Sequence, residues 1–125
     1  MSTRRPRFRV LFFRTDSGRE PVTEWLDKRR LRERAKLVQV SRWLEESGFT
    51  LGPPWLKKLD DEIWEVRVRL DDKCLRVLFY QPSRGTIVLL LAFSKKTEKT
   101  PRRELQTARG RMMRYWERRG RKEAS

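Results

Sequence analysis

Three stretches in the middle of the chain carry the hydrophobic pattern of β-strands. From residue 64 to residue 70, apolar side chains alternate with Glu and Arg, the period of two expected for a strand with one buried face. Two further strands are predicted at Leu75–Tyr80 and Thr86–Phe93, each after a turn-forming segment, and a separate one near the start at Arg7–Phe13. Thr86–Phe93 is apolar almost throughout, which predicts a central strand covered on both faces.

Helical spacing precedes and follows these strands. Apolar residues recur every three or four positions between Pro21 and Glu46, which predicts one broken helix or a helical hairpin, with the charged stretch 27–36 at the break or on the solvated face. A last helix is predicted from Thr100 as N-cap and Pro101 at the first helical position, followed by a solvated basic tail over 118–125. The element order predicts an α+β fold, a small twisted antiparallel sheet with an N-terminal helical pair and a C-terminal helix.

Charge and composition indicate the kind of partner that the protein binds. The 125 residues include 32 Lys and Arg against 17 Asp and Glu, a net charge of +15. Residues 63–125 hold 17 cations and 7 anions, 17 − 7 = +10, so a polyanionic partner is expected mainly at the second half. We expect one domain over residues 1–125, with its core at about 7–117.

Some sites are excluded by composition. One cysteine and no histidine leave no disulfide framework within the chain and no structural zinc site, and they favour the cytoplasm. No apolar run is long enough to cross a membrane. Cys74 lies in a predicted strand with no histidine to activate it, so it is interpreted as a small buried hydrophobe.

The segment from Phe93 to Arg103 joins the last strand to the last helix and contains five cations. Cations at a helix N-terminus are unfavourable by about 0.3–1 kcal/mol each. Arg102 and Arg103 in the first turn would therefore cost stability unless a phosphate binds there. Free backbone N–H groups, two Thr hydroxyls and the five cations together predict a pocket for such an anion. The alternative is a solvated charge run.

The predicted sheet supplies a second group of cations. Arg67 and Arg69 fall on the face opposite the apolar side chains of their strand, and Arg76 lies in the next strand. Like charges on neighbouring strands repel, so their grouping suggests a groove for phosphates, to which Arg can donate two hydrogen bonds at once. Alternatively, Arg69 or Arg76 pairs at the surface with Glu65, Asp71 or Asp72.

Two tryptophans flank these cations. Trp64 shares the apolar face of its strand and is assigned to packing, whereas Trp55, near Lys57 and Lys58, is a candidate rim contact for RNA bases.

Three motifs in this order resemble the HigB-type toxins of the RelE/ParE superfamily, in particular the phage-derived branch. They are LDDEIWEVRVRL at 59–70, LRVLFY at 75–80 and FSKKTEKTP at 93–101, and the resemblance covers about residues 8–116. It implies the fold predicted above, a co-encoded antitoxin with a helix-turn-helix domain, and, for RelE and HigB members, cleavage of mRNA on the translating ribosome. It implies no cofactor and no metal, because the ribose 2′-hydroxyl attacks its own 3′ phosphate.

The resemblance also implies roles for individual residues. The family's catalytic basic positions fall on Arg67, Arg76, Lys95 and Lys96, with Arg76 and Lys96 holding the phosphate and Arg67 supporting them. Lys57, Lys58, Arg69, Lys99, Arg102 and Arg103 are the further RNA-binding candidates. Glu65 replaces a Lys of RelE and is either the general base or a structural partner of Arg67. Arg102 stands where RelE has a Tyr, and with no His in the chain the proton carrier is expected to be Lys95 or Lys99.

Three functions are compatible with these features. The first is a ribosome-dependent mRNA endonuclease, with mRNA and the ribosome as partners. The second is a non-enzymatic toxin of the ParE type, and the third is a basic RNA-binding module without catalysis.

Overall fold

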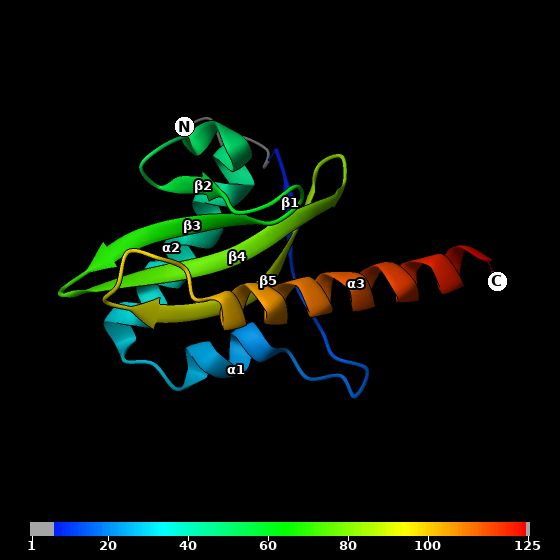
Figure 1. Cartoon of the computed structure of the whole chain (residues 1–125), viewed down its shortest axis with the longest axis horizontal. Helices are drawn as coiled ribbons and strands as arrows, with labels where there is room; N and C mark the ends of the chain where they lie inside the picture. The colour runs from blue at the N-terminus through cyan, green and yellow to red at the C-terminus, as the bar shows by residue number, and fades with distance from the viewer. Residues whose placement is uncertain (1–6, 125) are drawn as a thin grey trace, which may run out of the picture.

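In the computed structural model, which describes residues 7–124 with side chains to residue 120, one five-stranded sheet lies between two helical layers. The helices of the first layer are α1 (Pro21–Asp27) and α2 (Leu31–Ser47), followed by the short 3₁₀ helix η1 (Gly48–Leu51). The second layer is α3 (Arg102–Ala124), which lies in front of the sheet while α2 runs behind it (Figure 1). The strands are β1 (Arg9–Phe12), β2 (Leu56–Lys58), β3 (Trp64–Leu70), β4 (Lys73–Ser83) and β5 (Thr86–Lys95).

The α+β prediction is confirmed, with refinements in the sheet. The strand order is β1-β5-β4-β3-β2, so β4 is the central strand, and β5, predicted to be central, lies next to it. β3, β4 and β5 are antiparallel as expected, but β1 pairs with β5 in parallel and β2 adds an edge strand that was not predicted. The helical hairpin is also confirmed, with its break at residues 28–30.

Strand parity divides the core between the two faces of the sheet. Val66, Val77 and Leu89 pack with the buried face of α2, whereas Leu78, Tyr80 and Leu90 pack beneath α3. Both faces of β4 and β5 are covered along most of their length, which explains why β5 is apolar almost throughout. At one end of the sheet, the face that α3 covers is charged. Arg76 lies there, on the side of β4 that carries apolar residues further along the strand.

The last helix differs from the prediction at both ends. It begins at Arg102, after Pro101, and the Thr100 hydroxyl donates to Glu65 instead of capping the helix. The expected tail at 118–125 is helical to Ala124, because Arg, Lys and Glu favour helix and no proline interrupts them. The side chains of residues 121–125 lie outside the described residues.

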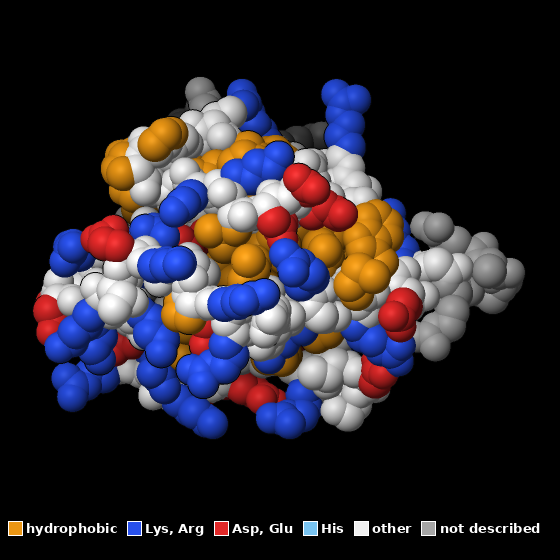
Figure 2. All heavy atoms as spheres, viewed as in Figure 1, with side chains coloured by type: hydrophobic (Ala, Val, Ile, Leu, Met, Phe, Trp, Pro, Cys, Tyr) orange, Lys and Arg blue, Asp and Glu red, His pale blue; other side chains and the backbone are white. Residues whose placement is uncertain are grey.

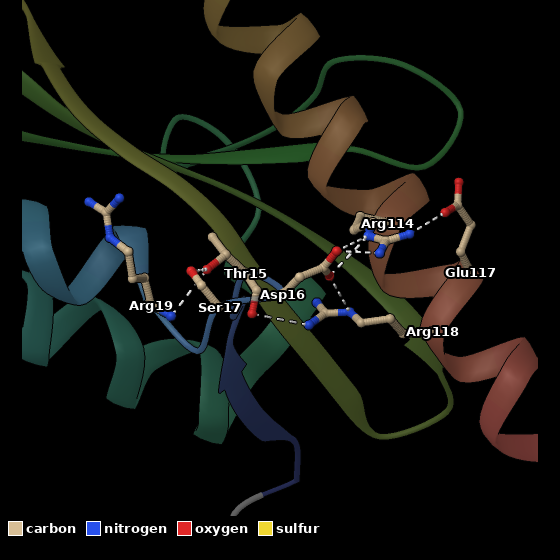
Figure 3. Close-up of polar contacts among 7 residues, drawn as sticks. All are labelled: Thr15, Asp16, Ser17, Arg19, Arg114, Glu117 and Arg118. Carbon is tan, nitrogen blue, oxygen red and sulfur yellow. Dashed lines mark hydrogen bonds and ion pairs between the residues drawn. The ribbon is translucent and has the colours of Figure 1, made fainter.

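A charged contact fixes α3 to the loop between β1 and α1 (Figure 3). Arg114 donates from Nε to both carboxylate oxygens of Asp16, at 3.0 and 2.9 Å, and also from Nη2. Arg118 approaches the same carboxylate and stacks over the Phe13 ring at 5.2 Å. Residues at opposite ends of the chain therefore hold the helix against the sheet.

None of the helices formed by residues 7–124 is long and apolar enough to cross a membrane.

Candidate nucleic-acid interface

The charged end of the α3 face encloses a hollow of about 250 Å³, which we call the basic hollow. Its cations come from three strands or strand ends, and its rim includes an exposed tryptophan. Figure 2 shows Lys and Arg side chains gathered on this part of the face, where β3 ends, β4 begins and β5 ends. The residues that line it are Pro54, Trp55, Arg67, Arg69, Asp72, Lys73, Cys74, Arg76, Lys96, Thr97 and Glu98.

Arg76 is the most unusual side chain of the basic hollow. It is 1% exposed, and its Nε and Nη1 atoms have no hydrogen-bond partner among the described residues. The guanidinium carbon lies 5.9 Å from the centre of the Phe93 ring, which gives the charge a partial cation–π contact. A buried cation without an anion is costly, so Arg76 destabilises the fold unless an anion binds it.

Arg67 lies directly opposite Arg76 in the β3–β4 register and is held differently. Its Nε donates to Glu65, and its Nη1 lies 3.6 Å from the exposed carboxylate of Glu98, but Nη2 has no partner among the described residues. Two arginines on adjacent strands thus bring unpaired N–H donors to one place. Such a pair matches the several oxygens of a phosphate group.

Glu65 fixes the position of Arg67. Its carboxylate is fully buried, with one oxygen bound to Arg67 and the other accepting from the Thr100 hydroxyl at 2.6 Å. Both carboxylate oxygens are hydrogen-bonded and closed to solvent. This geometry favours Glu65 as a structural partner of Arg67 over Glu65 as a general base. The Thr100 contact spans 35 positions of sequence and could not be predicted from spacing.

The acidic residues around the basic hollow leave Arg69 and Arg76 free. Asp71 pairs with Arg32, and Asp72 pairs with Lys96 at 3.0 Å. The hydrogen bond from Lys96 lowers the pKa of Asp72. Neither Arg69 nor Arg76 forms an ion pair within residues 7–120, so the proposed surface pairing of these two arginines is not observed.

The other predicted site residues lie around the basic hollow rather than in it. Lys95 is half-buried across from Cys74 in the β4–β5 register, and Lys57 is exposed across from Glu65. Lys58 covers the Trp64 ring at 5.7 Å. Lys99, Arg102 and Arg103 are exposed, as a solvated charge run would be.

The two tryptophans and the cysteine near the predicted site differ in their surroundings. Trp55 is 47% exposed on the rim of the basic hollow, where a base could stack on it, whereas Trp64 packs edge-on against Phe49 in the core. The prediction of Cys74 as a buried hydrophobe is wrong, because its thiol is half-exposed and lines the basic hollow. Residues two positions apart on a strand share a face, so strand parity with Arg76 is the signal that indicates this position.

A family model described as phage derived protein Gp49-like (DUF891) matches residues 24–113, which include α2, the strands β2 to β5 and the basic hollow. The chain belongs to this family. Gp49-like proteins are toxin-like proteins of the RelE/HigB type from toxin–antitoxin systems, which implies an antitoxin as partner. A comparison with curated proteins finds no match to the chain.

Proposed function

We propose that this Gp49-like protein is the toxin of a type II toxin–antitoxin system and cleaves mRNA on the translating ribosome without a metal ion. The observation that carries the proposal is Arg76, a residue of the basic hollow whose buried guanidinium has two nitrogen atoms without a partner among the described residues. Messenger RNA supplies a single strand of phosphates, and exposed rings such as Trp55 offer a stacking surface for its bases.

The chemistry proposed for this site is attack of a 2′-hydroxyl on the adjacent phosphorus. A proton leaves the hydroxyl, the phosphorane gains negative charge, and the departing 5′ oxygen takes up a proton. Arg76, with Lys96, holds the phosphate and the charge that develops on it, while Arg67 supports it from the opposite strand. Preorganised donors of this kind lower the barrier most when water is excluded, and the burial of Arg76 provides such an environment.

Proton transfer is assigned to the lysines next to the basic hollow. Glu65 is closed to solvent and serves to position Arg67, which leaves Lys95 and Lys99 as the candidates. Lys95 is the better placed of the two, because it is half-buried beside Cys74. Lys99 is exposed and lies outside the lining of the basic hollow. The RNA then follows the basic surface on which Lys57 and Arg69 lie, whereas Lys58 lies on the opposite face of the sheet, over Trp64.

The cognate antitoxin is proposed to carry a helix-turn-helix domain and an acidic segment that binds this chain. The charge of +15 should make the association fast and sensitive to salt. Calorimetry at low salt with the product of the adjacent reading frame tests this partner, and a lack of binding would remove it.

The test of the activity is a primer-extension map of cellular transcripts after brief induction of the protein. We expect discrete breaks within translated mRNA, absent from a matched transcript without a start codon. Arg76→Met should remove the breaks, whereas Arg42→Met, which replaces an exposed arginine of α2, should keep them. Growth arrest without breaks would instead favour a non-enzymatic ParE-like toxin, and RNA binding with neither effect would favour a simple RNA-binding module.

A further inference from the structure

The thiol of Cys74 lies among cations at the base of the basic hollow. Arg69 is its direct neighbour on β3 and Lys95 its direct neighbour on β5, while Arg76 follows two positions later on the same face of β4. The side chain is half-exposed, and its only hydrogen bond within the described residues is a long one of 3.9 Å to the Leu75 carbonyl. Because Cys74 lines the basic hollow and shares a face of β4 with Arg76, its side chain faces the hollow.

The basic hollow also has unmet capacity for an anion. Arg76, which is 1% exposed, lines it with Nε and Nη1 unpaired, and Arg67 lines it with Nη2 unpaired. The lining holds five cations against two carboxylates, Asp72 and Glu98, so 5 − 2 gives an excess of three positive charges. A cleft with such an excess of one sign raises the local concentration of oppositely charged solutes by about 10-fold or more. A small anionic reagent is consequently concentrated next to the only thiol of the chain.

We propose that Cys74 is a modification site that reacts selectively with the disulfides of small anionic thiols, for which glutathione disulfide is the model reagent. The Cys74 thiol releases its proton to water, and its sulfur attacks one sulfur of the reagent. A bond forms between Cys74 and one glutathione, the reagent's S–S bond breaks, and the departing thiolate takes up a proton. Cys74 is oxidised and the released glutathione is reduced, so no further reactant is needed.

The mixed disulfide would occupy the place proposed for the RNA phosphate. Its carboxylates are the ligands for which the unpaired donors of Arg76 and Arg67 are suited, and its bulk fills a hollow of about 250 Å³. This consequence rests on the proposed function, but the reaction itself does not. The modification reverses when a free thiol attacks the adduct, so it would act as a redox-controlled block of the site.

The first experiment measures the rate of adduct formation by intact-mass spectrometry on the folded full-length protein. Three reagents are compared: glutathione disulfide, which is anionic, hydroxyethyl disulfide, which is neutral, and cystamine, which is cationic. Relative to the rate of each reagent with free cysteine, we expect the order anionic, neutral, cationic, with a span of about 10-fold or more that shrinks in high salt. Equal relative rates, or an adduct that also forms on Cys74→Ser, would overturn the proposal.

A pair of charge variants tests the role of the neighbours. Arg69→Gln should slow the reaction with glutathione disulfide several-fold more than the reaction with hydroxyethyl disulfide, because it removes a charge that attracts the anionic reagent in addition to its effect on the thiolate. Arg42→Gln removes the same charge from the exposed face of α2 and should change neither rate. If the two variants slow the reaction equally, net charge rather than the basic hollow is responsible.

The second experiment measures binding of a short single-stranded RNA by fluorescence anisotropy before modification, after it, and after reduction. We expect about a 10-fold loss of affinity on modification and full recovery with dithiothreitol. An adduct that leaves RNA affinity unchanged would overturn the regulatory part of the proposal. If the unmodified protein binds no RNA, the proposed function fails, while the mass measurement still decides the reactivity of Cys74.

Discussion

Replacing Arg76 by Met should make the protein more stable and remove its activity. The guanidinium is buried with two nitrogen atoms unpaired, and an unsatisfied buried donor costs about 1–3 kcal/mol. The contact with Phe93 returns only about 1 kcal/mol. Methionine fills a similar volume without polar atoms, so we expect the free energy of unfolding to rise by about 1–3 kcal/mol, in line with other buried charges replaced by apolar side chains.

The matched control is the same substitution at Arg67, directly across the β3–β4 pair. Arg67→Met leaves the fully buried Glu65 with only the Thr100 hydroxyl, so its charge loses its counter-ion. Breaking a buried ion pair in this way costs about 3–5 kcal/mol. The two arginine substitutions should therefore change the stability in opposite directions. Adding Glu65→Gln should restore part of the loss in Arg67→Met, whereas in Arg76→Met, where Arg67 is intact, it should cost stability as it does in the wild type.

Urea unfolding at neutral pH measures both effects, with the slope of each transition used to check that the unfolding remains two-state. The activity of Arg76→Met is measured on translated mRNA, where loss of one preorganised charge donor should lower cleavage by about 10²-fold or more. An Arg76→Met protein that is less stable than wild type by about 1 kcal/mol or more would show that this arginine is a structural residue, and the reasoning about its unpaired donors would be wrong.

Three further predictions concern stability. Burial alone would raise the pKa of Asp60, but hydrogen bonds from Arg109 and two backbone N–H groups, with the charge of Arg109, hold it below its usual range. Its contribution is thus present above about pH 4 and lost as the pH falls through the folded pKa, so Asp60→Asn should flatten the acid limb of a stability–pH curve; an unchanged limb would exclude this pair as its cause. Tyr80→Phe should raise the free energy of unfolding by about 1 kcal/mol, because burial raises the pKa of Tyr80 and its hydroxyl has no partner among the described residues; a loss of stability in urea would reveal a hidden hydrogen bond. Gly48→Ala should cost about 2 kcal/mol or more, because Gly48 has a φ of 52° and a Cβ there would lie 2.1 Å from the Phe8 ring; a thermal melt equal to wild type would contradict this.

Local patterns predicted the sheet well where the side chains on the two faces differ. The alternation from Trp64 to Leu70 and the turn that follows it are found as expected, because a one-residue shift would have moved Val66 and Val68 out of the core that packs against α2. β2 was missed because it is only three residues long and two of them are lysines. The parallel pairing of β1 could not be read from local pattern, since it joins strands separated by most of the chain.

The candidate site was predicted as a set of cations but not as a geometry. Sequence placed Arg67 and Arg76 on neighbouring strands, and the register sets them directly opposite each other. It could not tell that one of them would be paired and the other unpaired, because the partner of Glu65 at Thr100 and the burial of Arg76 depend on tertiary packing. Lys99, Arg102 and Arg103 are exposed and lie outside the lining of the basic hollow, which could not be predicted because charge alone does not distinguish a pocket from a solvated surface.

The parallel pairing of β1 with β5 has a consequence for how the protein is made. Arg9 pairs with Thr86 and Phe12 with Leu89, so the first strand emerges from synthesis long before its only partner exists. The hairpin of β3 and β4, by contrast, joins neighbouring residues and can form early. During translation, the β3–β4 hairpin would thus bring Arg67 and Arg76 together before β5 completes the sheet. The helix α3, which Asp16 holds in place, is synthesised last. A nascent chain would accordingly carry these arginines before Lys96, Thr97 and Glu98 complete the lining of the basic hollow, so the order of synthesis would itself delay the activity proposed for the site.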